Sequence, residues 1–261
     1  MKNLQKAILP LLLLATSSLH ALYLGNPASP NAIAEGFYIA QDAVIGVKAG
    51  YQVDYVFDRE LKSYAGARAR VDQFQAQFNQ GVLTFGFIER IEVYASAGAM
   101  EATFSHRPKS GHARREYQTN DKLTWGVGGR AIIYEWKDCC LSIEGGYQFA
   151  YPRIKWDALN GTSFTTDAKM LYREWQTGLG VSRKIDMFIP YGAIKYSAVH
   201  ARVTSVRSNM ELGTSHFKMT NRNHFGLVLG CTLTPGKYFD ITVESRMIDE
   251  EALTLAGNFK F

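Results

Sequence analysis

The chain has 261 residues, of which 46% are hydrophobic, 13% aromatic and 20% charged, and its formal net charge is +5. This weak, dispersed charge does not indicate a nucleic-acid-binding protein. No apolar run after the N-terminal segment reaches the roughly 18 residues of a membrane-spanning helix, which excludes a helical membrane protein. A transmembrane β-barrel would escape this test because its apolar residues alternate with polar ones.

Residues 1–21 contain the three regions of a secretory signal in order. Lys2 and Lys6 precede the apolar run 7–15, and the small residue Ala21 ends the segment. The run is too short to span a bilayer, and no stop-transfer pattern follows, so an N-terminal anchor helix is disfavoured. We expect export, cleavage after Ala21, and a single domain over residues 22–261 with a net charge near +3, since Lys2 and Lys6 are removed.

Residues 22–42 predict an irregular segment, and 43–57 contain the clearest periodicity. Every odd position from Ala43 to Phe57 is apolar, while the other face holds Lys48, Gln52 and Asp54. A run of this length exceeds a usual globular strand and suits a tilted membrane strand. Such a face would promote aggregation in water, whereas lipid requires it.

The connections beyond this strand alternate between two classes. Tight polar turns are expected at 89–90, 137–138, 184–186 and 235–237, and longer polar stretches at 58–75, 105–120, 152–168 and 204–214. This alternation is typical of the periplasmic turns and extracellular loops of outer-membrane barrels. The predicted strands are 43–57, 76–88, 91–104, 122–136, 140–151, 169–183, 187–203, 215–233, 238–248 and 252–261.

Residues 61–78 leave room for a further strand pair, in which the alternation slips at Gln73. We therefore expect an all-β protein, a transmembrane antiparallel up-and-down β-barrel of about 10–12 strands, with a larger number left open. The last ten residues fit its closing strand, because Leu253, Leu255, Phe259 and Phe261 share one face. Phe259 and Phe261 are the barrel-closing signature.

Polar residues on the opposite strand faces are expected to point into the lumen, since a basic residue facing lipid costs about 2–4 kcal/mol at the bilayer midplane. The pore-lining candidates are Lys48, Gln52, Asp54, Glu144, Gln148, Glu174, Gln176, Arg222, Glu244 and Arg246. Mixed charges can line a wet pore or pair into a plug. Barrels of about eight strands are filled by side chains and those of 16–18 strands are open, so a barrel of 10–12 strands leaves both alternatives.

Five stretches carry a resemblance to a known family. They are Ala21–Pro27 (ALYLGNP), Tyr51–Lys62 (YQVDYVFDRELK), Trp125–Tyr151 (WGVGGRAIIYEWKDCCLSIEGGYQFAY), Tyr172–Ser197 (YREWQTGLGVSRKIDMFIPYGAIKYS) and Lys237–Phe261 (KYFDITVESRMIDEEALTLAGNFKF). In this order they resemble segments of the chlamydial major outer membrane protein family. Members are longer and richer in cysteine. The resemblance implies an outer-membrane porin that also strengthens the envelope, with lipid and small hydrophilic solutes as partners.

The sequence offers little for catalysis or cofactors. The histidines and cysteines form no metal-ligand spacing, and we expect no metal and no cofactor. Ser110-Gly111-His112 lacks a nucleophile elbow and a placed carboxylate, so a solvated loop is the better interpretation and we expect no enzyme.

Cys139 and Cys140 follow a tight turn and should lie at the periplasmic rim, where thiols tend to pair. Adjacent cysteines form only a strained bond with each other. Cys231 shares a face with apolar residues and is expected to point to lipid. Cys139 and Cys140 are therefore candidates for disulfides to other chains, in line with the cross-linked envelope that the resemblance implies. The alternative is that both are merely small residues at a rim.

Three function classes follow. A diffusion porin, as a monomer or homo-oligomer, is favoured by the resemblance. A structural or adhesive surface barrel with a filled lumen is the alternative. A membrane-embedded hydrolase has no supporting motif.

Overall fold

The computed structural model describes residues 23–33, 44–64, 69–107, 114–206 and 216–261. The expected signal segment 1–21 and its cleavage point lie outside the described residues, as does Ser110-Gly111-His112. No helix in the described residues is long and apolar enough to cross a membrane.

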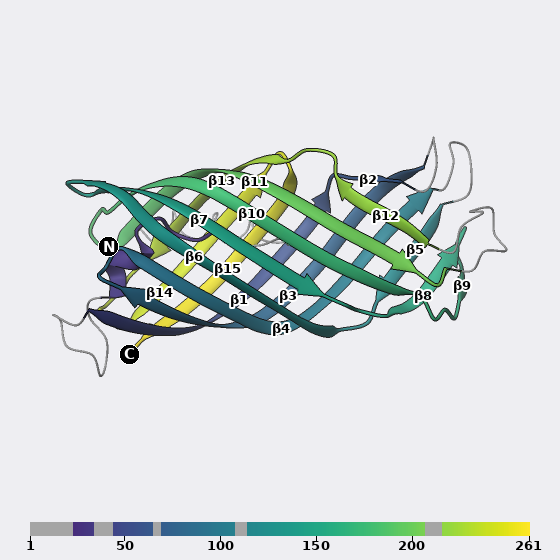
Figure 1. Cartoon of the computed structure of the whole chain (residues 1–261), viewed down its shortest axis with the longest axis horizontal. Helices are drawn as coiled ribbons and strands as arrows, with labels where there is room; N and C mark the ends of the chain where they lie inside the picture. The colour runs from purple at the N-terminus through teal and green to yellow at the C-terminus, as the bar shows by residue number, and fades with distance from the viewer. Residues whose placement is uncertain (1–22, 34–43, 65–68, 108–113, 207–215) are drawn as a thin grey trace, which may run out of the picture.

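Ten antiparallel strands close into a barrel (Figure 1). They are β1 (Ile45–Arg59), β3 (Arg70–Phe87), β4 (Ile91–Arg107), β6 (Lys122–Trp136), β7 (Cys139–Ala150), β10 (Lys169–Arg183), β11 (Phe188–Thr204), β13 (Phe225–Leu233), β14 (Phe239–Met247) and β15 (Glu250–Lys260). Each pairs with the next in chain order, and β15 pairs with β1 to close the ring. The predicted up-and-down barrel is confirmed at ten strands.

The predicted single strand 215–233 is wrong, because the chain breaks there into β12 (His216–Asn221) and β13. The side chain of Asn221 takes the place of a ladder partner: its Oδ1 accepts the Val199 backbone N–H at 2.6 Å, and its Nδ2 donates to the Ser197 carbonyl at 3.3 Å. The freed strand β12 bends away from the wall and pairs with β2 (Leu61–Ser63).

The long stretches expected as loops are partly strands. β5 (Arg115–Thr119), β8 (Ile154–Leu159), β9 (Thr162–Phe164), β2 and β12 extend the sheet beyond the ring at one end of the molecule (Figure 1). The expected slip of alternation at Gln73 coincides with a register shift between β3 and β4 at 71–73. The expected tight turns lie at the opposite end, where Glu89, Lys137 and Asp186 have positive φ.

An apolar belt surrounds the outer wall, as the alternation predicts. Ile194 and Phe259 are 62% and 57% exposed on it. Aromatic contacts follow the belt on its long-loop side, including Trp125–Tyr147, Trp175–Tyr196 and Tyr196–Phe225 with ring centroids 5.3–5.9 Å apart. Phe239 and Phe259 form a similar contact at 4.8 Å near the tight-turn end. Aromatic rings at both edges of an apolar band are typical of outer-membrane barrels.

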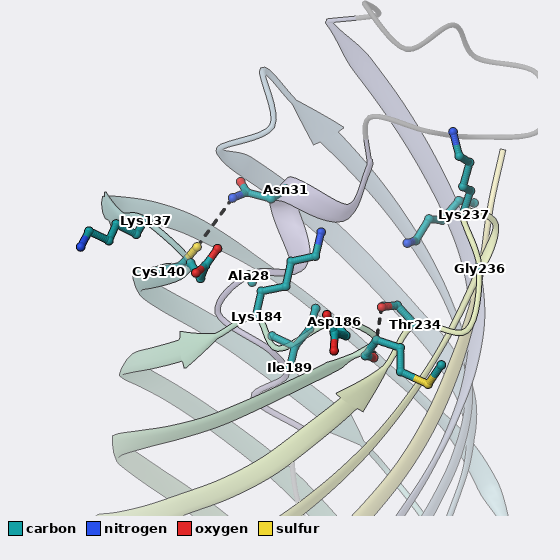
Figure 2. A pocket seen from close by; sticks show the side chains of 13 residues that line it. Ala28, Asn31, Lys137, Cys140, Lys184, Asp186, Ile189, Thr234, Gly236 and Lys237 are labelled. Carbon is teal, nitrogen blue, oxygen red and sulfur yellow. Dashed lines mark hydrogen bonds between the residues drawn. The ribbon is translucent and has the colours of Figure 1, made fainter. Parts of the chain in front are cut away.

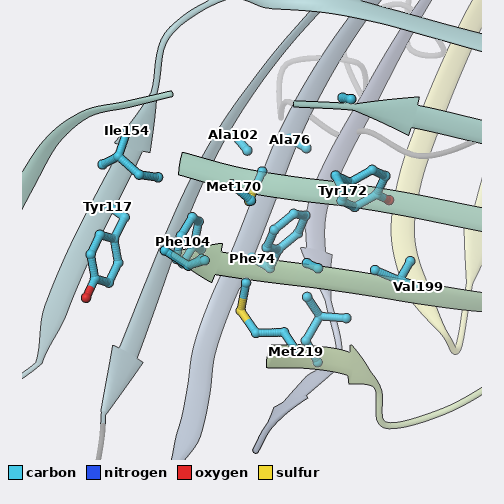
Figure 3. Close-up of a cluster of buried hydrophobic side chains, with 14 of the residues drawn as sticks. Phe74, Ala76, Ala102, Phe104, Tyr117, Ile154, Met170, Tyr172, Val199 and Met219 are labelled. Atoms are coloured by element: carbon cyan, nitrogen blue, oxygen red, sulfur yellow. The ribbon is translucent and has the colours of Figure 1, made fainter. Parts of the chain in front are cut away.

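Beyond the belt, on the long-loop side, the two faces of the wall exchange character. Outward positions of β3 become polar, at Gln75, Gln77 and Asn79. The inward positions become apolar and form a buried cluster, part of which Figure 3 shows. Stacked rings such as Phe104–Tyr117, at 4.9 Å, fill its interior. This end therefore has the core of a soluble protein, while the belt section has a polar interior.

Candidate functional site

The candidate site is the interior of the barrel within the apolar belt. Nine of the ten predicted pore-lining residues are buried there: Lys48, Gln52, Asp54, Glu144, Gln148, Glu174, Gln176, Glu244 and Arg246. Strand alternation turns them inward because the other face of each strand is apolar and lipid-facing.

Arg222 lies elsewhere, contrary to the alternation. It follows Asn221 in the bend between β12 and β13, its side chain is exposed, and its backbone N–H donates to the Glu60 carbonyl. The interruption that Asn221 introduces resets the strand phase and turns Arg222 away from the lumen.

The N-terminal segment 23–33 lies inside the lumen and ends in the short 3-10 helix η1 (Ser29–Ile33). The backbone N–H groups of Leu24 and Gly25 donate to the Glu244 carboxylate at 3.0 and 2.7 Å. Asn26 Nδ2 donates to Thr232 Oγ1 at 2.8 Å and to the Ile189 carbonyl at 3.1 Å. The segment thus inserts as an internal plug bonded to the wall.

A glycine fits the plug to the wall at its tightest point. Gly25 has a φ of +86°, and a Cβ placed on it would collide with the Arg130 guanidinium. Arg130 also donates to the Leu24 carbonyl. Both the left-handed conformation and the close approach favour glycine here.

The first charged network surrounds the plug. Arg130 pairs with Glu92 and, at 2.8 Å, with Glu144. Lys48 pairs with Glu92 at 3.3 Å and donates to both oxygens of Ser29 at 2.8 Å. Wall charges therefore neutralise one another and also bind η1.

The second network lies nearer the long loops. Arg246 pairs with Asp54 at 2.9 Å, Glu244 at 2.7 Å and Glu250 at 3.3 Å. Arg59 holds Glu174 at 2.6 Å and Glu250 at 3.1 Å.

Lys195 completes this network by pairing with Glu250 and, at 3.1 Å, with Asp249 in the β14–β15 turn. Burial raises the pKa of the Asp249 carboxyl, and its neighbour Glu250 raises it further. Together the two networks contain five bases (Lys48, Arg59, Arg130, Lys195 and Arg246) and seven acids (Asp54, Glu92, Glu144, Glu174, Glu244, Asp249 and Glu250), all buried.

Sequence reasoning missed six of these charges. Glu92, Arg130 and Lys195 follow the alternation of correctly predicted strands and could have been found from it. Arg59 could not, because a register shift between Val56 and 58 turns it inward. A β-bulge of this kind re-aims the side chains that follow it. Asp249 and Glu250 fall at a turn that the predicted strand boundaries missed.

A cavity of about 620 Å³ opens at the tight-turn end (Figure 2). Lys137, Lys184 and Lys237 line it, and η1 contributes Asn31. Between the plug and the wall, the cavities found in the described residues are small, at about 20 and 40 Å³. The interior is therefore an open vestibule on one side of the plug and filled along the belt.

The three cysteines are free thiols in this structure. Cys139 is half-buried and Cys140 is buried, lining the vestibule, where Asn31 Nδ2 lies 3.6 Å from its Sγ. Cys231 is half-buried on the outward face of β13. Among the described residues, no cluster of histidine, cysteine or carboxylate side chains could hold a metal ion.

Comparison with known proteins gives one consistent family. The profile of the Chlamydia major outer membrane protein family matches residues 156–215. The major outer membrane porin of Chlamydia trachomatis serovar D is 23% identical over 395 aligned residues that cover all of both chains, and the serovar L1 protein is 22% identical with the same coverage. The chain belongs to the chlamydial major outer membrane protein family. Because the alignment exceeds 261 positions, it is a short, divergent member.

Solved outer-membrane barrels resemble this family member only loosely. OprG of Pseudomonas aeruginosa is 12% identical with a TM-score of 0.40, covering 88% of this chain and 99% of its own. The β domain of the Bordetella autotransporter BrkA is 10% identical with a TM-score of 0.43, covering 84% and 99%.

Proposed function

We propose that the protein is an outer-membrane porin for small hydrophilic solutes with a structural role in the envelope. The observation that carries this function is the interior of the belt section, where charges of both signs occupy every level of a closed wall. Full-length relatives bear the name of major outer membrane porins. The nine inward residues are the proposed pore lining, and removal of 1–21 is the proposed step before assembly.

Solute passage requires a rearrangement of this structure. The plug fills the belt section, and the apolar cluster fills the long-loop end. The plug is held by hydrogen bonds and by charges that also have partners on the wall, so its release leaves those charges paired. We propose that the structure is the closed state and that departure of segment 23–33 opens the tight-turn side.

Planar-bilayer conductance tests the function. Discrete open-channel steps are expected from the purified full-length protein, and silence under all voltages would contradict a porin.

A cysteine cross-link tests the plug. Asn31→Cys, in a Cys139→Ser, Cys231→Ser background, places a thiol beside Cys140. A short, reducible bis-thiol cross-linker should abolish the conductance steps, and reductant should restore them. The same background without Asn31→Cys is the matched control, since it lacks the second thiol. Steps that persist after verified cross-linking would show that the plug does not close the pore.

The filled interior favours one second candidate, a structural surface barrel without a useful pore. The apolar cluster supports it, since nothing in a diffusion pore requires a buried core at its mouth. Silence in the bilayer, together with loss of envelope strength on deletion of the gene, would favour this candidate. Disulfide links to other envelope chains through Cys139 and assembly into homo-oligomers are further proposals that fit both functions.

A further inference from the structure

The outer wall carries a concentrated positive strip on one side of the long-loop end. We define the basic strip as Arg173 on β10, Arg202 on β11, Lys218 on β12 and Lys62 on β2, all exposed. Arg202 stands directly opposite Lys218 in the β11–β12 register. The strip therefore brings side chains from four segments of the chain onto one face.

The basic strip begins just beyond the aromatic edge of the apolar belt. Arg173 is two residues along β10 from Trp175, whose ring lies 5.3 Å from that of Tyr196. Two strand residues span about 7 Å. Aromatic rings occupy the level of the lipid head groups, so the strip lies at the head-group level of the outer leaflet.

Acidic neighbours do not neutralise the basic strip. Within the described residues, no ion pair joins Arg173, Arg202 or Lys218 to a carboxylate, although like charges directly opposite each other destabilise a sheet. In the lumen, by contrast, all five bases have acidic partners. The cost of the repulsion would be offset by an anion bound from outside.

The other side of the same end shows that this is not a general solubility feature. There Arg70 and Arg107 both pair with Asp72 at 2.6 Å, and Arg114 pairs with Glu116 at 3.0 Å. Outward residues of β3 are neutral amides. The unpaired positive charge is thus confined to the β10–β11–β12–β2 side.

We propose that the basic strip binds the phosphorylated head groups of glycolipid in the outer leaflet. Two guanidinium groups can each hold a phosphate through paired N–H donors, and the ammonium groups add point charges. Position favours membrane lipid over a soluble anion, because the strip continues directly from the lipid-facing aromatic edge. Basic clusters beside a membrane attract anionic head groups in the same way.

The test compares lipids that differ only in phosphate. The full-length protein, folded in zwitterionic detergent, is titrated with fluorescent bis-phosphorylated lipid A and with its dephosphorylated form. Tighter binding of the phosphorylated lipid is expected. The variant Arg173→Gln, Arg202→Gln, Lys218→Gln should lose affinity on the order of a hundred-fold.

The matched control removes the same number of charges from the other side, as Arg70→Gln, Arg107→Gln, Arg114→Gln, and should bind like wild type. Heat-modifiable gel mobility establishes that both variants are folded. Equal loss in both variants would overturn the proposal in favour of net charge. Equal binding of both lipids, or displacement of the lipid by soluble polyphosphate at matched phosphate concentration, would also overturn it.

Discussion

Removing the side chain of Asn26 should open the channel. Asn26→Ala deletes two hydrogen bonds between the plug and the wall, at 2.8 and 3.1 Å. Each contributes about 0.5–1.5 kcal/mol net, so the closed state should lose about 1–3 kcal/mol. No large desolvation penalty is added at Thr232, because its hydroxyl keeps the bond to Thr242 Oγ1 at 2.7 Å.

This loss corresponds to a rise of about 5- to 150-fold in the ratio of open to closed channels. The assay is the open probability of single channels in planar bilayers. Asn223→Ala is the matched control, since that asparagine is exposed and its side chain donates to Glu60 outside the lumen. An unchanged ratio for Asn26→Ala, with the fold intact, would refute the plug as the closing element.

Three further predictions concern the wall, the lumen and the rim. Ile194→Arg should destabilise the barrel by about 2–4 kcal/mol in urea unfolding from lipid vesicles, read by heat-modifiable mobility, because Ile194 faces lipid. His200→Arg, on the same outer face beyond the belt, should be neutral, and equal costs would place the belt wrongly. The excess of seven acids over five bases predicts cation preference, measured as the reversal potential in a KCl gradient; an anion preference would contradict it. On non-reducing gels of whole envelopes, an oligomer ladder should vanish in Cys139→Ser and persist in Cys140→Ser, because Cys140 points into the vestibule; a lone monomer band would argue against cross-linking.

Strand positions could be predicted where the alternation is strong and turns bound it. The ranges 122–136 and 169–183 coincide with β6 and β10 for this reason. A period of two places residues on faces, but it does not say which face points inward. Within the belt the cost of charge in lipid decides this, and beyond the belt that cost is absent. The apolar cluster at the long-loop end was therefore not foreseen.

The plug and the networks depend on contacts that no local pattern records. Asn26 bonds to residues 163 and 206 positions away, and its segment has no periodicity. Arg59 enters the lumen through a register shift, and Asn221 ends a strand by satisfying backbone groups of β11. Each is an irregularity of one or two residues that inverts the side-chain direction for the rest of its strand.

The internal plug also has a consequence for the order of assembly. Its N-terminal end is synthesised and exported first, but its partners Ile189, Thr232 and Glu244 belong to the last strands of the wall. The segment can find all of its hydrogen bonds only after β11, β13 and β14 stand in register. Protection of residues 23–33 from a protease should therefore arise late, and it would report the moment at which the ring closes.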